Sequence, residues 1–335
     1  KRTAFAQSDT GKQIMTAMID AVRRKEASGM VERFSHHSFL TLRLCDNICC
    51  GCVIRDEYSQ ETVELPGDAV IVATGGMHGL FGNTTGSLSN TGEVTAELFR
   101  LGVPLANGEM IQYHPTTVKC GGKRMLISEA ARGEGGRLFA MKDGKQWYFM
   151  EEKYPELGNL MPRDITAREI WKVSHESEVF LDMTEISEEI ISNKLSGLAD
   201  DCMTYLHKDI RKEPVSVLPG IHYFMGGILV DEQHRTPIQN LCAAGECCAQ
   251  YHRANRLGGN SLLGALYGGR VAAKSACEQA DVVDLSCATQ IDFPPASQIS
   301  EIKQLNKVMQ ETMGVVRNEN TLLNGIQTVQ ALTGN

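Results

Sequence analysis

The chain has 335 residues, of which 42% are hydrophobic and 22% are charged, so it is long enough for one large domain or for two to three smaller ones. Its formal net charge of −8 argues against a nucleic-acid-binding surface, and any cationic site must therefore be local. No run approaches 18 consecutive apolar residues, and the opening stretch KRTAFAQSDTGK lacks the apolar core of a secretion signal.

The 11 cysteines, in the absence of a secretion signal, favour a reducing compartment over a disulfide framework. Four of them cluster between Cys45 and Cys52, but no second pair follows at the spacing of a zinc site, and Cys247-Cys248 has no matching pair either. We therefore expect no metal, and we interpret these residues as buried or half-buried thiols on strands.

In chain order, residues 11–27 have apolar side chains at helical spacing and predict a helix. Residues 39–56 predict two strands about a turn at Asp46-Asn47. The apolar run 69–73 predicts a buried strand that stops at the glycines 75–76, where α/β sheets present ligand sites. Residues 91–102 predict another helix.

From residue 110 to 218 the spacing of apolar residues becomes less regular. We predict polar turns there, and short helices at 164–173, 185–194 and 199–208. The alternation of apolar and polar residues returns in GGILVDEQ (226–233) and in NLCAAGE (240–246). NLCAAGE resembles another strand of the first sheet. This interruption predicts a second domain inserted into the first. The tail predicts two helices separated by a break near 314–319.

Four short stretches carry side chains that are suited to catalysis or to binding a ligand. His114 precedes a proline in QYHPTT, which holds its backbone extended, and His222 precedes a glycine turn in PGIHYFMGG. If LISEAARGEGG is helical, it places Ser128, Glu129 and Arg132 within one turn. Each residue alone is more often structural than functional, so only their combination carries weight.

Two arginines complete the combination. Arg163 begins a predicted helix in NLMPRDITAREI, and Arg256 stands among glycines that let the backbone approach a ligand closely. Asn260 and Ser261 bring hydrogen-bonding groups to the same place. Two histidines and two arginines thus flank the predicted domain junctions. Because an arginine binds a carboxylate by two parallel hydrogen bonds, such a cleft suits a small dicarboxylate.

These stretches together resemble the flavoprotein subunits of succinate dehydrogenases and fumarate reductases, in an order that runs through nearly the whole chain. KDGKQWYFMEEKYPELGN and KRTAFAQSDTGKQ resemble the Bacillus-like branch. L-aspartate oxidase is a related family that shares HPT, PRD and the His-Tyr-x-x-Gly-Gly stretch. The methionine of HYFMGG and the glycine of RLGGNS favour the succinate dehydrogenases and fumarate reductases over it. The resemblance rests on ATGG (73–76), SNTGE (89–93), QYHPT (112–116), SEAARGEGG (128–136), PRDITAREI (162–170), IHYFMGGILVD (221–231) and ANRLGGNSLL (254–263).

The resemblance implies a mixed α/β fold, α+β overall, in which a Rossmann-like FAD-binding domain is interrupted by an inserted capping domain and followed by the start of a helical domain. We expect the FAD-binding domain at 1–109 and 219–287, the capping domain at 110–218 and the start of the helical domain at 288–335. No G-x-G-x-x-G occurs, although relatives use it to bind the FAD pyrophosphate. We therefore expect a fragment that lacks the N-terminal portion of the FAD-binding domain.

The resemblance also implies roles for individual residues. His114 and Ser128 would hold one substrate carboxylate, while His222 and Arg256 would hold the other. Glu246 would bind the ribityl chain of FAD. Further backbone and side-chain contacts to FAD would come from Ala73, Thr74, Gly75, Gly76, Asn260, Ser261 and Leu262.

For the reaction, the resemblance implies that a hydride passes between flavin N5 and one central carbon of the dicarboxylate. Arg163 would exchange a proton with the adjacent carbon, relayed through Glu129 and Arg132. An arginine is a poor acid, with a pKa above about 12. Its use is intelligible because a carbon acid next to a carboxylate is weaker still. Closing the capping domain would expel water and bring Arg163 onto the substrate.

The implied partners are succinate or fumarate, an iron-sulfur subunit, and a membrane cytochrome b or quinone anchor that would hold the protein at the inner face of the cytoplasmic membrane. Two alternatives stay open: an L-aspartate oxidase-like flavoenzyme, and a non-catalytic relative that binds FAD or a dicarboxylate. Glu93 and Arg253 depart from the family pattern, which usually has aspartate and glycine at these positions.

Overall fold

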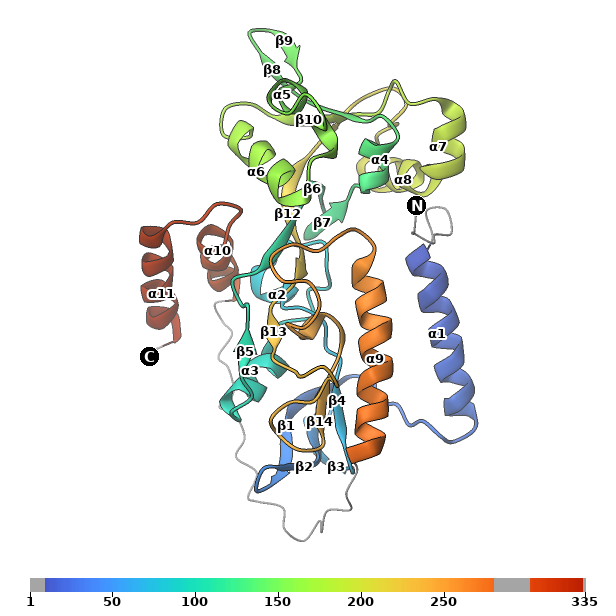
Figure 1. Cartoon of the computed structure of the whole chain (residues 1–335), viewed down its shortest axis with the longest axis vertical. Helices are drawn as coiled ribbons and strands as arrows, with labels where there is room; N and C mark the ends of the chain where they lie inside the picture. The colour runs from blue at the N-terminus through green and yellow to red at the C-terminus, as the bar shows by residue number, and fades with distance from the viewer. Residues whose placement is uncertain (1–9, 280–301, 334–335) are drawn as a thin grey trace.

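The computed structural model describes residues 10–279 and 302–333 and shows a body of strands and helices beneath a second, smaller body (Figure 1). The predicted mixed α/β architecture is confirmed. The lower body contains helices α1 (Thr10–Ala27), α2 (His78–Phe81), α3 (Glu93–Arg100) and α9 (Asn260–Gln279). The predicted helices at 11–27 and 91–102 are thus confirmed, with small changes at their ends.

The strands of the lower body form three groups. The predicted hairpin is confirmed as β1 (His37–Cys45) and β2 (Ile48–Asp56), which pair antiparallel and are joined by β3 (Thr62–Pro66). Strand β4 (Val70–Val72) pairs in parallel with β14 (Leu241–Ala243), so NLCAAGE does supply another strand beside the first buried one. A further pair joins β5 (Leu105–Ala106) to β13 (Gly227–Ile228).

The upper body has more strands than we predicted. Strand β6 (Ile111–Cys120) lies between β12 (Leu218–Phe224) and β7 (Lys123–Leu126). A second antiparallel sheet has the order β11 (Val215–Ser216), β10 (Val179–Asp182), β8 (Arg137–Lys142) and β9 (Lys145–Trp147). The interpretation of 110–218 as turns and short helices is therefore wrong for these strands.

The strands were missed because their buried positions are not marked by apolar alternation. In β6 the buried run includes Thr116 and Thr117, whose hydroxyl groups donate to the carbonyl oxygens of Ile127 and Leu218. Hydrogen bonding rather than hydrophobicity thus accounts for their burial. The expected strand in GGILVDEQ is also mostly wrong, because only Gly227–Ile228 is extended in a ladder.

The short helices of the upper body fit the predictions better. The predicted helices correspond to α6 (Arg163–Val173), to α7 (Glu188–Lys194), and to α8 (Ser196–Asp201) with the turn η2 (Cys202–Leu206) that follows it. The others are α4 (Glu129–Gly133), α5 (Phe149–Lys153) and η1 (Gly158–Leu160).

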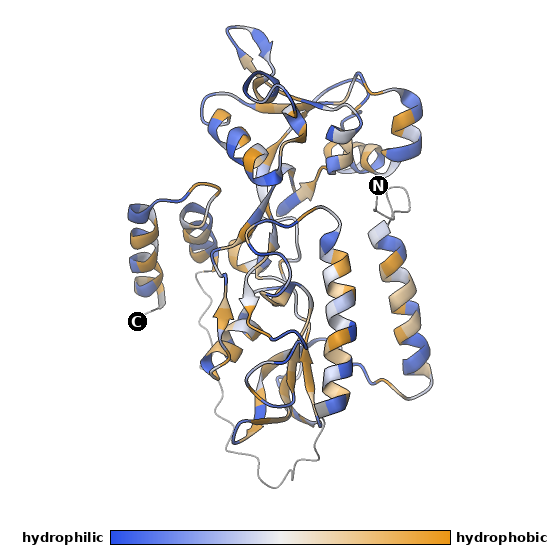
Figure 2. Ribbon diagram, in the orientation of Figure 1, coloured by the Kyte–Doolittle hydropathy of each residue, from blue (hydrophilic) through white to orange (hydrophobic). Residues whose placement is uncertain are grey.

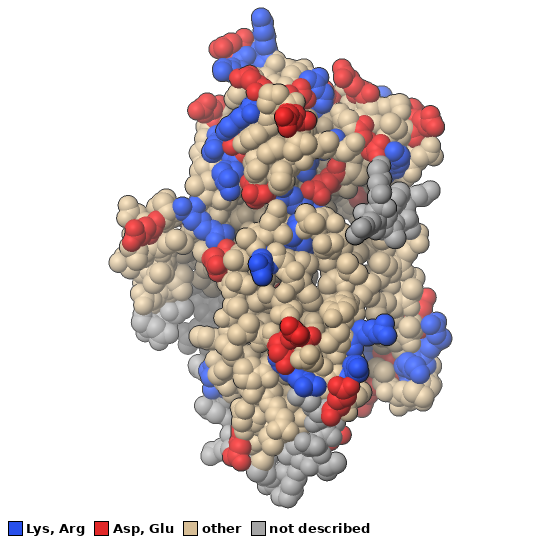
Figure 3. Space-filling model, viewed as in Figure 1, with Lys and Arg blue, Asp and Glu red and all other residues tan. Residues whose placement is uncertain are grey.

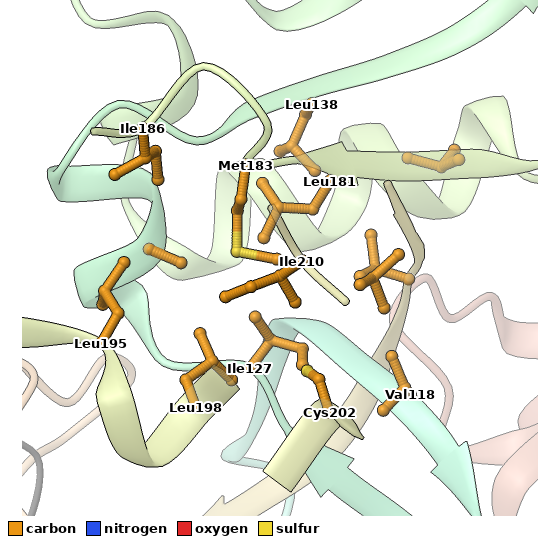
Figure 4. Packing of buried hydrophobic residues seen from close by; sticks show 14 of the residues in the cluster. Val118, Ile127, Leu138, Leu181, Met183, Ile186, Leu195, Leu198, Cys202 and Ile210 are labelled. Carbon is orange, nitrogen blue, oxygen red and sulfur yellow. The ribbon is translucent and has the colours of Figure 1, made fainter. Parts of the chain in front are cut away.

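Each body has its own hydrophobic core. The upper core runs from Val118 to Val217 and includes Ile127, Leu138 and Leu181, none of which has exposed surface (Figure 4). The lower core includes Leu98, Ile228 and Leu241. Figure 2 shows hydrophobic residues along the strands of the lower body and on the helices that pack beside them. The boundaries of the expected domains stay a prediction.

The tail forms α10 (Ile302–Thr312) and α11 (Glu319–Thr333), which confirms the two predicted helices and the break between them. Asn306 on α10 donates to the carbonyl oxygens of Gly79 and Leu80, at 2.8 and 2.7 Å. The hydroxyl group of Tyr113 donates to the Met313 carbonyl oxygen at 2.8 Å. The helix pair is therefore attached to both α2 and β6.

The cysteines mostly follow the prediction. Cys49, Cys50, Cys247 and Cys248 are buried free thiols, and Cys52 is half-buried. Cys45 is disulfide-bonded, so the prediction of a thiol is wrong at that position. Residues 10–279 and 302–333 contain no group of three or more His, Cys, Asp or Glu side chains that could hold a metal. No helix within these ranges is long and apolar enough to cross a membrane.

Candidate active site

The centre of the candidate site is an ion pair between Arg163, the first residue of α6, and Glu129, the first residue of α4. Arg163 Nε donates to Glu129 Oε1 at 2.8 Å, and Nη2 donates to Oε2 at 2.9 Å. This is the bidentate arrangement that fixes a guanidinium group in orientation as well as in position. The Arg163 side chain is 10% exposed, so one part of it still reaches the cavity.

Gln112, which the sequence analysis did not single out, supplies the third contact to Arg163. Arg163 Nη1 donates to Gln112 Oε1 at 2.9 Å, and Gln112 Nε2 donates to the Arg256 carbonyl oxygen at 2.7 Å. One buried amide therefore connects α6 to the loop that carries Arg256. A signal was present in QYHPTT, because Gln112 and His114 are two residues apart on a strand and share a face.

Arg132 lies behind the same carboxylate. Its Nη2 approaches Glu129 Oε1 at 3.4 Å, its Nη1 donates to the Asn159 carbonyl oxygen at 2.5 Å, and its side chain is 3% exposed. Burial lowers the pKa of Arg132, and the charge of Glu129 partly opposes that shift. Burial alone would raise the pKa of Glu129, but the hydrogen bond from Arg163 and the positive charges of Arg163 and Arg132 bring it below its ordinary value.

The two histidines meet because their strands pair. The register of β6 and β12 sets His114 opposite Gly220, and the His114 and His222 rings lie with their centroids 5.3 Å apart. His114 is fully buried and its Nε2 has no hydrogen-bond partner. His222 Nδ1 lies 2.7 Å from the hydroxyl oxygen of Thr85, which orients the ring.

Both imidazoles are held neutral. Burial and the charge of Arg163 place the pKa of His114 well below its ordinary value. Burial, together with Arg163 and Arg256, lowers the pKa of His222 to about 3. Near neutral pH each ring therefore offers one N–H donor and one acceptor rather than a positive charge.

Arg256 brings a second guanidinium group to the cavity. It is 3% exposed, its guanidinium carbon lies 4.5 Å from the centroid of the Tyr223 ring, and its Nε and Nη2 are buried without a partner. Burial and the charge of Arg163 lower its pKa to about 10. Buried donors are almost always satisfied, so these nitrogens, which no described residue accepts from, are available to a ligand.

A cavity of about 420 Å³ lies at the ion pair, lined by Glu129, Arg132, Arg163 and Arg256 among others, whereas His114, His222 and Ser128 are not among the residues that line it. Gly258 closes one side, where a Cβ would lie 2.8 Å from Glu129 Oε2, so no larger residue fits against the ion pair. Figure 3 shows charges of both signs spread over the upper body, whereas the cations of this site are largely buried. The cationic site, which the negative net charge led us to expect to be local, therefore lies inside the protein.

Ser128 is more exposed than the other residues that we predicted to bind the substrate. It is exposed and forms the N-cap of α4, where its hydroxyl oxygen accepts from the Ala130 N–H at 3.2 Å. Its hydroxyl proton is left for another acceptor. Ile127 N donates to the Thr116 carbonyl oxygen, so the pairing of β6 with β7 continues toward His114 and Ser128.

The residues predicted to contact FAD surround the ends of β4 and β14. Ala73, Thr74, Gly75 and Gly76 follow β4 and line a second cavity of about 420 Å³. Glu246 follows β14 on the turn η3 (Gly245–Cys247). Asn260, Ser261 and Leu262 form the first turn of α9, which packs beside both strands.

The structure also shows where Glu93 and Arg253 lie, the two residues that depart from the family pattern. Glu93 is exposed at the start of α3 and lines the cavity beside Gly75 and Gly76. Arg253 is exposed and has φ of 48°, a left-handed backbone in which glycine is the default residue. The preceding residue, His252, has a buried Nε2 without a hydrogen-bond partner.

Comparison with known proteins places the chain among flavoproteins. Residues 1–262 match the family described as "FAD binding domain". The succinate dehydrogenase flavoprotein subunit of Bacillus subtilis is 42% identical over 294 residues, covering 85% of this chain and 50% of the relative. The L-aspartate oxidase of Clostridium perfringens is 33% identical over 272 residues, covering 79% of this chain and 58% of the relative. The chain thus spans about half the length of these relatives.

Among solved structures, the quinol fumarate reductase of E. coli superposes with a TM-score of 0.85 at 27% identity. The match covers 99% of this chain and 62% of that one. This agreement extends through both bodies and the two C-terminal helices.

The neutral state of His222 has a consequence for stability. An unfolded chain would protonate this histidine as the pH falls below about 6.5, whereas the folded protein resists protonation down to about pH 3. The unfolded state binds more protons in this window, so the free energy of unfolding falls as the pH drops through it. We expect His222→Gln to flatten this dependence by roughly 1 kcal/mol per pH unit.

The measurement is urea unfolding between pH 7 and pH 4. His175→Gln, which changes an exposed histidine on the upper body, is the matched control and should leave the slope unchanged. Equal slopes for His222→Gln and the unsubstituted protein would show that His222 is not held neutral.

Proposed function

Because this chain belongs to the family of FAD binding domains, we propose that it acts in the FAD-dependent interconversion of succinate and fumarate. The observation that carries the proposal is a set of buried nitrogens without a partner among the described residues, on His114 and Arg256, beside an Arg163 that is clamped by Glu129. A site of this kind supplies anchoring points for two carboxylates and a charged group between them.

FAD fits the ends of β4 and β14. Glu246 keeps one carboxylate oxygen, Oε2, without a hydrogen bond from any described residue, and the cavity beside Gly75 and Gly76 is open. Carboxylate oxygens accept from hydroxyl groups, which suits the ribityl chain. Ala73, Thr74 and the first turn of α9 would complete the cradle, with Asn260, Ser261 and Leu262. When bound, FAD supplies the two-electron hydride chemistry.

The dicarboxylate would lie between the two bodies. One carboxylate would accept from His114 Nε2 and from the Ser128 hydroxyl group, and the other from His222 and the free nitrogens of Arg256. Neutral imidazoles suit this role, because they donate to the carboxylates without adding further positive charge beside the arginines. The bound dianion would offset the positive charges that this interior gathers.

Arg163 would exchange the proton with the substrate carbon. Its bidentate contact with Glu129 and its third contact with Gln112 fix the plane of the guanidinium group. Glu129 also approaches Arg132, so a proton that leaves Arg163 has a continuous route of charged groups. Arg163 stands on the proposed capping domain, 110–218, and Arg256 on the proposed FAD-binding domain, 1–109 with 219–287.

We further propose that electrons pass to an iron-sulfur subunit and then to a quinone-reactive membrane anchor. This arrangement would hold the protein at the inner face of the cytoplasmic membrane through its partners. Support comes from the relatives, which include a subunit of succinate dehydrogenase and a quinol fumarate reductase.

A substrate comparison tests the proposed reaction. We expect the native protein to reduce an artificial dye with succinate and to show no turnover with L-aspartate and oxygen, since the site offers anchors for two carboxylates and none specific to an amino group. Turnover with aspartate instead would favour the L-aspartate oxidase alternative. FAD binding without turnover on either substrate would favour a non-catalytic relative.

Arg163 gives the test of the proton-transfer step. Arg163→Lys keeps the charge but loses the planar fork, and Arg163→Gln loses both, so each should lower the rate of fumarate reduction by about 10² or more. FAD content should stay unchanged, because the residue contacts no part of the proposed cofactor site. The measurement is steady-state fumarate reduction by a reduced dye, normalised to flavin.

Arg168→Gln is the matched control, because Arg168 lies on the same helix with its side chain 47% exposed. It should retain the full rate. If Arg163→Gln keeps more than about a tenth of the rate, Arg163 is at most a binding contact.

Arg256 should behave differently from Arg163. Arg256→Gln removes a carboxylate clamp, so we expect the KM for fumarate to rise about tenfold or more, with a smaller loss in kcat from misalignment. Arg253→Gly serves as the control, since Arg253 is exposed nearby and its change should alter KM by less than about tenfold. A loss confined to kcat would assign Arg256 to the chemical step instead.

A further inference from the structure

His78 is a buried histidine beside the proposed FAD site that the proposed mechanism does not use. It begins α2, directly after the glycines that follow β4, and its side chain is 4% exposed. Both ring nitrogens have partners: Nδ1 lies 2.6 Å from the hydroxyl oxygen of Thr84, and Nε2 lies 3.0 Å from Glu246 Oε1. A buried histidine with two specific partners has a defined orientation and a defined proton arrangement.

The partners determine which nitrogen of His78 carries the proton. Glu246 Oε1 accepts from the Phe224 N–H at 2.9 Å, and an ionised carboxylate can only accept, so Nε2 must be the donor. The hydroxyl group of Thr84 accepts from the Gly86 N–H at 3.1 Å, and both the Ile221 carbonyl oxygen, at 3.0 Å, and His78 Nδ1 compete for its one proton. Whichever of these two takes the Thr84 proton, the carboxylate of Glu246 requires a proton on His78 Nε2.

The surroundings are shaped around this ring. Its plane lies nearly perpendicular to that of Phe224, with centroids 5.0 Å apart. At Gly86 a Cβ would lie 2.4 Å from the ring, so only glycine leaves room for His78 there. The close fit on both sides fixes the plane of the ring, and in that plane its Nε2 lies at Glu246 Oε1.

The result is an asymmetric carboxylate on Glu246. Oε1 receives two donors, from His78 and Phe224, whereas no described residue donates to Oε2. The Glu246 side chain is 20% exposed, so a ligand can still reach it. Two fixed donors on one oxygen set the direction in which the other oxygen points.

We propose that His78 is a positioning residue for the cofactor: its Nε2–H holds Glu246 Oε1 so that Oε2 is presented to a hydroxyl group of FAD. This inference rests on the proposed role of Glu246 in binding FAD. It assigns a function to a histidine that the sequence analysis did not single out.

The first test is the affinity of the native protein for FAD, measured by the quenching of flavin fluorescence. His78→Met removes the donor but fills much of the space, and we expect FAD to bind about tenfold more weakly. His78→Gln can place an amide N–H near the position of Nε2, and we expect it to stay within about threefold of the unsubstituted protein.

A double-mutant cycle separates positioning from packing. In a Glu246→Ala background there is no acceptor left for His78 to hold, so His78→Met should change FAD affinity less than about twofold further. If His78→Met has the same effect in both backgrounds, His78 acts by packing and the proposal is wrong. Unchanged affinity in His78→Met alone would also overturn it.

A second test needs no cofactor. A two-bond ¹H–¹⁵N correlation spectrum of the chain near pH 7.5 reports which nitrogen of His78 carries the proton, and we expect Nε2. A proton on Nδ1 alone would overturn the proposal, because Nε2 could not then donate to Glu246. If this result is as expected but the unsubstituted protein binds no FAD, the proposed function fails while the His78–Glu246 contact stands.

Discussion

The arrangement of the candidate site depends on one carboxylate, that of Glu129, which holds Arg163 by two hydrogen bonds and approaches Arg132 on its other side. Burying guanidinium groups is costly unless each is paired in good geometry. Among the described residues, one carboxylate contacts these two cations, and Arg256 faces the same cavity with two nitrogens that no described residue accepts from. The described residues therefore leave positive charge unbalanced at this cavity, and a bound dianion would balance it.

The fold brings these groups together from segments far apart in the chain. Pairing of β6 with β12 sets His114 beside His222, and the helix caps at Ser128 and Pro162 place Glu129 and Arg163 at the starts of their helices. The loop before α9 then approaches from the other body, where Gly258 allows contact with the ion pair. Gln112 connects the two sides through hydrogen bonds to both. Relative movement of the bodies would thus change the site directly.

Sequence patterns predicted α1, α3, α6, α7, α8 and the two tail helices, the β1–β2 hairpin and the parallel partner of β4, because apolar periodicity and turn residues mark these elements locally; they did not predict the long helix α9. Strand β6 was missed, since its threonines bury their hydroxyl groups by hydrogen bonds to distant carbonyls. Motif resemblance found the three arginines that line one cavity with Glu129, and the two histidines whose rings lie together. Gln112 and His78 escaped because their partners are set by tertiary contacts across more than 100 residues, which no local pattern records.

The central claim is that one dicarboxylate completes this site. A crystal structure of the native protein with FAD and a non-reacting dicarboxylate such as malonate tests it most directly. The account predicts one carboxylate on His114 and Ser128, the other on His222 and Arg256, and the Arg163 guanidinium group against the carbon between them. A dicarboxylate bound elsewhere, with the nitrogens of Arg256 and His114 Nε2 still unpartnered, would contradict it.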